Sequence, residues 1–171
     1  MRRSALIIIF ALGFAYPAFC ADVVMRHIPN AQIVGEGRLS VIFWDVYDAT
    51  LYAREKKLNP DEPFALSIRY MRQIEGRDIA ERSAQEIRLQ GFDDEATLAA
   101  WNGQMKSIFP DVKDGTVLLA VFIPGKETLF YQADKPIGRI QDAQFTRWFS
   151  NIWLAEKTSE PALRRKLLGM S

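Results

Sequence analysis

Arg38 and Tyr47 are the two residues whose chemistry best suits a binding site. A guanidinium is permanently charged and donates hydrogen bonds in a fork that fits a carboxylate. A phenol adds one directional hydrogen bond from an otherwise apolar body. At the mouth of an apolar cavity, the pair would hold an anionic head group while the cavity takes an apolar tail. The sequence therefore predicts Arg38 and Tyr47 as the ligand-binding residues for a small apolar anion.

Two interpretations are open for Asp45 and Asp48, which lie among apolar residues. They could serve acid/base chemistry, with Arg38 as the electrophile of an isomerase or lyase and Asp45 or Tyr47 as its proton-transfer group. They could instead make structural hydrogen bonds at a strand end, with an arginine nearby. We expect the structural role, since an unpaired buried carboxylate is costly. A set of aromatic residues could line a cavity or simply form the core: Phe43, Trp44, Phe122, Phe130, Trp148 and Trp153.

Several other chemistries are not indicated. The chain has one Cys and one His, which excludes a Cys/His metal cluster built by this chain alone. His27 has no evident partner for a catalytic triad, and we expect it on the surface of a strand. Gly125-Lys126 lacks the spacing of a phosphate-binding loop. We therefore expect no cofactor and no metal. The formal net charge of +1 gives no basic field for nucleic acid.

The N-terminal residues 1–21 resemble a signal peptide. Arg2 and Arg3 precede an apolar stretch over residues 5–15, which is shorter than the ~20 residues that a membrane span needs. Cleavage could follow Cys20 or Ala21, and a lipidated Cys20 is the competing interpretation. We expect one domain over residues 22–171, periplasmic or secreted, with no membrane span after signal removal. The composition, 49% hydrophobic and 25% charged, is that of a globular protein.

The order of the expected elements predicts an α+β fold, an antiparallel sheet with helices packed on a face. Helices are expected from Asp78, where Asp78 and Glu81 form a capping signature and Gly91 follows the end, and from Asp93-Asp94 to Pro110. Further helices follow Asp142 and Ser159–Pro161. Gly35-Glu36-Gly37 indicates a turn. Strands are expected over residues 23–28, 32–34, 38–53, 64–70, 117–123, 128–131 and 137–140, with 39–47 apolar on both faces.

Several segments resemble the chalcone isomerase-like superfamily, and more closely its secreted bacterial branch. They are Gly35-Glu36-Gly37-Arg38, residues 45–52 (DVYDATLY), residues 109–115 (FPDVKDG), the Pro124-Gly125 hairpin and residues 149–154 (FSNIWL). The resemblance runs from about Ala31 to Gly169, nearly the whole expected domain. The resemblance implies an open-faced β-sandwich, a large antiparallel sheet with a layer of helices and a ligand cleft between them.

The resemblance also bears on function. Arg38 matches the arginine that polarises the substrate in the plant enzymes, and Tyr47 matches the tyrosine of the fatty-acid-binding relatives, where the enzymes have a threonine. Phe92 replaces a tyrosine of the enzymes, and Asn102 lies about one turn later than their asparagine. We therefore expect non-catalytic binding of a small apolar carboxylate such as a fatty acid. The alternatives are an isomerase acting on an unknown periplasmic substrate and an interaction module without a ligand. Protein partners and oligomeric state stay open.

Overall fold

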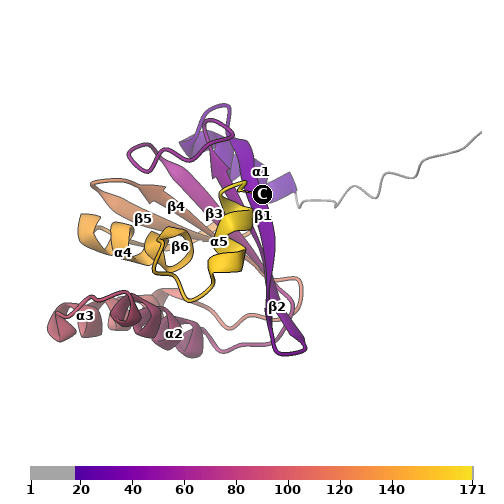
Figure 1. Cartoon of the computed structure of the whole chain (residues 1–171). Helices are drawn as coiled ribbons and strands as arrows, with labels where there is room; N and C mark the ends of the chain where they lie inside the picture. The colour runs from indigo at the N-terminus through magenta and orange to yellow at the C-terminus, as the bar shows by residue number, and fades with distance from the viewer. Residues whose placement is uncertain (1–17, 171) are drawn as a thin grey trace, which may run out of the picture.

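A six-stranded antiparallel sheet, in which each strand pairs with the next along the chain, forms the centre of the fold (Figure 1). The structure is a computed structural model that describes residues 18–170. Its strands are β1 (Gln32–Val41), β2 (Trp44–Ala53), β3 (Phe64–Tyr70), β4 (Val117–Ile123), β5 (Glu127–Gln132) and β6 (Lys135–Ile140). Every neighbour in the sheet is thus also the next strand in sequence, although the connection between β3 and β4, residues 71–116, carries two of the helices.

Four helices cover one face of the sheet. They are α2 (Gly76–Leu89), α3 (Glu95–Ile108), α4 (Ala143–Leu154) and α5 (Pro161–Leu167). In Figure 1, α4 and α5 lie against the sheet, and α2 and α3 run side by side below them. The main core lies between these layers and includes an aromatic group formed by Phe109, Phe122, Phe130, Phe145 and Phe149. The α+β prediction, with one sheet and one layer of helices, is confirmed.

The first described element corrects the prediction of a strand over residues 23–28. This segment belongs to a helix, α1 (Ala18–His27). Val23, Val24 and Ile28 are almost fully buried against the sheet face opposite the four helices. A helix satisfies its own backbone hydrogen bonds, so a terminal segment can lie across a sheet face without an edge strand to pair with. The tertiary contact of residues 23–28 with the sheet therefore overrides their local β propensity.

His27 is accordingly not a strand residue. It is the last residue of α1, and its Nε2 lies 2.8 Å from the Tyr131 hydroxyl oxygen. Burial of the ring lowers the pKa of His27, and the charge of Arg26 lowers it further. The signal-peptide prediction falls almost entirely on residues 1–17, which lie outside the described residues. Val23 and Val24, which α1 buries against the sheet, follow Ala21 and remain in the chain after either expected cleavage.

The turn expected at Gly35–Gly37 is also wrong, because β1 runs without a turn from Gln32 to Val41. The two glycines instead allow α5 to lie directly on the strand. A Cβ added to Gly35 would overlap the backbone carbonyl oxygen of Lys166, and one added to Gly37 would lie 2.7 Å from Cδ1 of Leu163. The missing side chains are therefore a packing requirement rather than a turn signal.

The reversal of the chain occurs further along, inside the segment expected to be one strand. β1 ends at Val41, β2 begins at Trp44, and the intervening turn holds Ile42 and Phe43. Ile42 and Phe43 are 84% and 94% exposed. Apolar residues occupy both odd and even positions of 39–47 because this segment forms the end of a hairpin. The two faces of a single strand are not both covered there.

The remaining local signals hold, with one exception. Asp94 and Asp142 cap α3 and α4 by accepting hydrogen bonds from backbone N–H groups of the first turn, as expected. Strand β3 has the predicted bounds. The exception is α2, which begins before Asp78: its first N–H, on Gly76, donates to the Asp111 carboxylate at 2.8 Å. A distant aspartate supplies the cap that the local signature predicted.

The glycine contact gives a test of the packing between β1 and α5. Replacing Gly35 with Ala forces the backbone of α5 away from the strand, and overpacking of this kind costs roughly 1–3 kcal/mol of unfolding free energy. Gly103 is the matched control: it lies inside α3 with nothing near its missing Cβ, so Gly103→Ala should stabilise by roughly 0.5–1 kcal/mol. Urea unfolding of both variants measures the difference. A Gly35→Ala variant as stable as wild type contradicts the close approach.

Candidate ligand pocket

The side chain of Arg38 lies in an ionic network on the face of the sheet opposite the four helices. It donates from Nε to Asp48 at 2.7 Å and from Nη1 to Asp45 at 2.8 Å. Arg69 donates to the same Asp48 at 2.7 Å, and Ser40 donates to Asp45 at 2.6 Å. The structural interpretation of the two aspartates, with an arginine nearby, is therefore the one that the geometry supports.

The electrostatics of this network favour the charged forms of Arg38, Asp45 and Asp48. Hydrogen bonding to Asp48 raises the pKa of Arg38 above its ordinary value. The pKa of Asp48 is lowered, first by its hydrogen bonds to Arg38 and then by that to Arg69. The pKa of Asp45 is lowered mainly by the hydrogen bond from Ser40 and also by Arg38. Neither carboxylate is poised to take or give a proton near neutral pH.

Tyr47 lies on the other side of the same strand, toward the helices. Its hydroxyl accepts a hydrogen bond of 2.9 Å from the indole Nε1 of Trp153 in α4, and its ring meets the Tyr70 ring edge to face. Burial raises the pKa of Tyr47, only partly offset by the bond from Trp153. The phenol therefore stays neutral and acts as a hydrogen-bonding group rather than a base.

The expectation that Arg38 and Tyr47 meet over one cavity is wrong. In the β1–β2 ladder, Arg38 pairs with Asp48 and Leu39 pairs with Tyr47. Paired residues of an antiparallel ladder point to the same face, and successive residues point to opposite faces. Arg38 and Tyr47 are thus directed to opposite sides of the sheet. A ligand-binding role for either residue separately stays a prediction.

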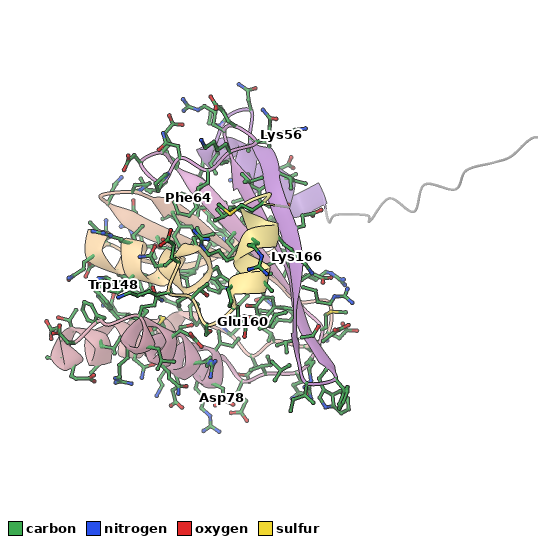
Figure 2. The ribbon with its side chains drawn as sticks, in the orientation of Figure 1. Lys56, Phe64, Asp78, Trp148, Glu160 and Lys166 are labelled. Carbon is green, nitrogen blue, oxygen red and sulfur yellow. The ribbon has the colours of Figure 1, made fainter. Side chains whose placement is uncertain are left out.

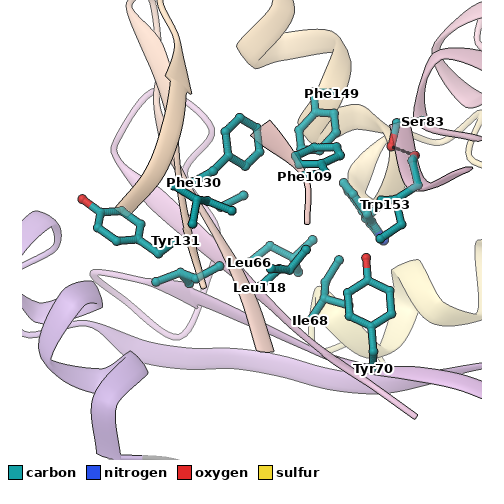
Figure 3. Close-up of a pocket in the computed structure, with 14 residues that line it drawn as sticks. Leu66, Ile68, Tyr70, Ser83, Phe109, Leu118, Phe130, Tyr131, Phe149 and Trp153 are labelled. Carbon is teal, nitrogen blue, oxygen red and sulfur yellow. Dashed lines mark hydrogen bonds between the residues drawn. The ribbon is translucent and has the colours of Figure 1, made fainter. Parts of the chain in front are cut away.

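A small apolar cavity of about 50 Å³ lies on Tyr47's side, between the sheet and the helices (Figure 3). Strands supply its floor through Leu66, Ile68 and Tyr70, while α2 and α4 close it with Ser83, Phe149 and Trp153. None of its lining residues is charged. Of the aromatic residues suggested as a lining, Phe130 and Trp153 line the cavity, whereas Phe43 and Trp44 lie exposed in the hairpin.

Tyr70 is the polar group of this cavity, and the sequence analysis missed it. Figure 3 shows its hydroxyl directed into the cavity, toward Trp153. Within residues 18–170 this hydroxyl has no hydrogen-bond partner, whereas the Ser83 hydroxyl is engaged by the backbone oxygen of Ile79 at 2.8 Å. Burial raises the pKa of Tyr70, so it is a neutral donor. The alternation of Phe64, Leu66, Ile68 and Tyr70 was the available signal, since it ends a buried face with a phenol.

Phe92 and Asn102 lie away from the cavity. Phe92 is buried and stacks on Trp101 with ring centroids 4.7 Å apart, and Trp148 meets its ring edge to face. The side-chain oxygen of Asn102, in α3, is buried and has no hydrogen-bond partner among the described residues. In the part of the chain from 18 to 170, no cluster of three or more His, Cys, Asp or Glu side chains is arranged to hold a metal ion. No helix there is long and apolar enough to cross a membrane.

A family model described as chalcone isomerase-like matches residues 29–169, which include the whole sheet and the four helices on its core face. This chain belongs to the chalcone isomerase-like family. The segments from Gly35-Glu36-Gly37-Arg38 to residues 149–154, from which the sequence analysis inferred the resemblance, all lie within the matched range. The secreted bacterial branch of the family stays a prediction.

Two relatives give this chalcone isomerase-like chain further context. An uncharacterized protein of Haemophilus influenzae is 30% identical over 139 residues, which are 81% of this chain and 68% of that protein. The crystal structure of a fatty-acid binding protein of Arabidopsis thaliana superposes with a TM-score of 0.63, covering 82% of this chain and 87% of the other at 13% identity. At that identity the superposition shows a shared fold.

The ionic network predicts how stability depends on pH. Because the pKa of Asp48 lies below its ordinary value of 3.8, its stabilisation is present above that value and is lost as the pH falls through the lowered pKa. Asp48→Asn should therefore reduce the free energy of unfolding near neutral pH by on the order of 1 kcal/mol, because the partners are partly exposed and screened. The difference from wild type should shrink at an acid pH below 3.8, as the pH approaches the lowered pKa of Asp48.

Urea unfolding at the two pH values checks this, with Asp61→Asn, an exposed aspartate of the β2–β3 loop outside the network, as the matched control. A deficit in Asp48→Asn that persists unchanged in acid would assign the role of Asp48 to packing instead of charge.

Proposed function

We propose that this chalcone isomerase-like protein binds a small apolar ligand between its sheet and its helices, without catalysis. The observation that carries the proposal is the unpartnered Tyr70 hydroxyl inside an otherwise apolar cavity. Asn102 and Glu127, and not Tyr70, hold the fully enclosed unpartnered atoms of residues 18–170, so the Tyr70 hydroxyl is open to the cavity and free to bond a ligand head group there. The fold shared with a fatty-acid binding protein makes a fatty acid the first candidate.

The head group would meet neutral donors rather than a cation. Tyr70 presents its phenol to the cavity, the Tyr47 ring packs edge to face against the Tyr70 ring, and no charged residue lines the cavity. A carboxylate transferred to such surroundings without a charged partner is strongly disfavoured. The geometry therefore favours the uncharged acid form of a fatty acid, or a fatty alcohol of equal length, over the anion that the sequence analysis expected.

The cavity must widen to take an acyl chain. Its 50 Å³ is about a third of the ~150 Å³ that an engineered protein cavity needs to hold benzene. The wall that can move is the helical layer, since each strand is held by its ladders, whereas α4 packs on β4 and β5, and α2 packs on α3 and α4, without a backbone ladder. Binding would then select an opened arrangement of these helices.

The isomerase alternative has less support from the geometry. It requires Arg38 to polarise a substrate that Tyr47 or Asp45 protonates, yet Arg38 is committed to two carboxylates on the face opposite Tyr47. An interaction module without a ligand is the outcome that remains if no apolar ligand binds.

Ligand titration with two variants tests the proposed site. Tyr70→Phe removes one hydrogen bond, which is worth about 1 kcal/mol, so affinity for a fluorescent fatty acid should fall by roughly five-fold. Ala120→Val adds methyl groups to the cavity wall and should weaken binding at least as much while the protein stays folded. Calorimetry or fluorescence displacement measures both effects.

Arg38→Gln is the matched control, because its side chain faces away from the cavity, and it should leave affinity unchanged. A fatty alcohol should bind at least as well as the acid of equal length. Loss of binding in Arg38→Gln with retention in Tyr70→Phe would move the site to the other face. Failure of every fatty acid and alcohol to bind would leave the interaction module.

We further propose that the protein is periplasmic or secreted after removal of its first 20 or 21 residues. The support is the charged, then apolar character of residues 2–15, together with the buried Val23 and Val24, which either cleavage would leave in the folded protein. The intact mass of the protein from a periplasmic extract distinguishes cleavage after Cys20, cleavage after Ala21 and a lipidated Cys20. A mass that retains residues 1–21 contradicts the proposal.

A further inference from the structure

The turn of the β1–β2 hairpin exposes four consecutive apolar residues, Val41, Ile42, Phe43 and Trp44, here called the tip. Their exposed fractions are 50%, 84%, 94% and 62%. Only four other large apolar side chains of the described residues are exposed, and those are scattered: Met25, Ile33, Leu89 and Met170. Single exposed apolar residues are ordinary, whereas a contiguous group marks an interaction site.

The tip projects beyond the rest of the sheet. The β1–β2 ladder continues to the pair Val41–Trp44, while the β2–β3 ladder ends at the pair Tyr47–Tyr70. The hairpin therefore extends about three residues past its neighbouring strand, or about 10 Å at the rise of a β-strand. Figure 1 shows the turn at the end of β1 and β2 standing clear of the helices, and Figure 2 shows the same end of the hairpin with side chains drawn.

Folding requirements do not explain the residue at the centre of the tip. Ile42 has φ of 59°, in the left-handed region that glycine and asparagine favour and that a β-branched residue adopts at a cost. Its side chain is not buried, so packing within the chain does not compensate for that cost. Contacts within the described chain therefore do not explain an isoleucine at this position.

Polar groups surround the hairpin immediately behind the tip. On one face, Ser40 and Asp45 bond to each other and Asp45 pairs with Arg38. On the other face, the Arg72 guanidinium lies 4.9 Å from the ring centre of Trp44 and takes part in no ion pair within residues 18–170. From Phe43 to Asp45 is two residues, or about 7 Å. Interfacial segments bury their apolar faces to a similar depth in a bilayer, about 5–10 Å.

We propose that the Val41–Trp44 tip inserts into the interfacial region of a phospholipid bilayer. Ile42 and Phe43 would enter the upper acyl region, and Trp44 would sit at the headgroup level that tryptophan favours. Arg72 would meet lipid phosphate, while the Asp45 carboxylate and its partners limit the depth of insertion. A folded protein partner fits less well, because a stable interface takes about 20–30 residues a side and the tip offers four.

The proposal is independent of the ligand in the cavity, but the two features are close. Tyr47, whose ring packs against the cavity-lining Tyr70, lies three residues along β2 from Trp44. Docking by the tip would bring the Tyr70 end of the cavity to the membrane surface, where apolar ligands partition. Failure to bind fatty acids would contradict the proposed ligand site and leave the proposed membrane insertion standing. Failure to bind vesicles would contradict the insertion and leave the ligand site standing.

Vesicle co-sedimentation tests the insertion. The purified protein should partition onto phosphatidylcholine vesicles, with modest enhancement when phosphatidylglycerol is added. Ile42→Ser with Phe43→Ser should reduce the partition coefficient roughly tenfold or more, because two apolar side chains no longer leave water. Phe43→Glu alone should do the same. Leu89→Ser, at an isolated exposed leucine of α2, is the matched control and should partition as wild type does.

A second readout locates the tip. Lipids brominated near the headgroup should quench fluorescence in the wild type, and Trp44→Phe should lose most of that quenching while still binding. Unchanged circular dichroism and melting temperature will show that the exposed variants fold.

Three outcomes overturn the proposal: no partition of the wild-type protein, equal partition of the double variant, or binding only to anionic vesicles that high salt abolishes. A concentration-dependent dimer that the double variant loses, without vesicle binding, would replace the bilayer with a second copy of this chain.

Discussion

The register of the β1–β2 ladder decides which side chains of this protein reach its interior. Because neighbouring residues on a strand point to opposite faces, pairing Arg38 with Asp48 places Leu39 and Tyr47 on the helical side. Arg38 then becomes the centre of an external ionic network, and Tyr47 becomes the hydrogen-bond acceptor of Trp153 in α4. A shift of one residue would exchange these roles and bury a guanidinium among aromatic rings.

The same strand also brings the helical layer onto the sheet. Gly35 and Gly37 lie on the side of Leu39 and Tyr47, and their missing side chains let α5 lie directly on β1. α4, joined to α5 by a short connection, holds Trp153 over Tyr47 and Phe149 over the centre of the sheet. The cavity is small because the helices pack tightly on the sheet. Entry of a ligand would therefore require the helices to move.

The β1–β2 hairpin therefore has two different features a few residues apart, an uncharged cavity near its base and an exposed apolar turn. Near its base, Tyr47 packs against Tyr70 of β3, whose phenol lines a cavity that no charged residue lines and that suits a neutral head group. At its turn, the four apolar side chains of the tip are exposed to solvent. A protein that takes an apolar ligand from a membrane requires both an apolar interior and a means of docking, and this hairpin places them three residues apart.

Local sequence signals determined most of the elements of this fold. Alternation alone predicted β3 over residues 64–70, and Asp94 and Asp142 predicted the starts of α3 and α4, because strand periodicity and helix caps depend on residues a few positions apart. The segregated order of strands and helices predicted the α+β class for the same reason. Tertiary structure decided what local residues leave open. Val23 and Val24 became helical through burial on a distant sheet face, and Asp111 rather than Asp78 capped α2. Arg38 and Tyr47 lie on opposite faces of the sheet because the pairing register of the strands decides which face each residue occupies. Register is a long-range property that the type of a single residue does not determine.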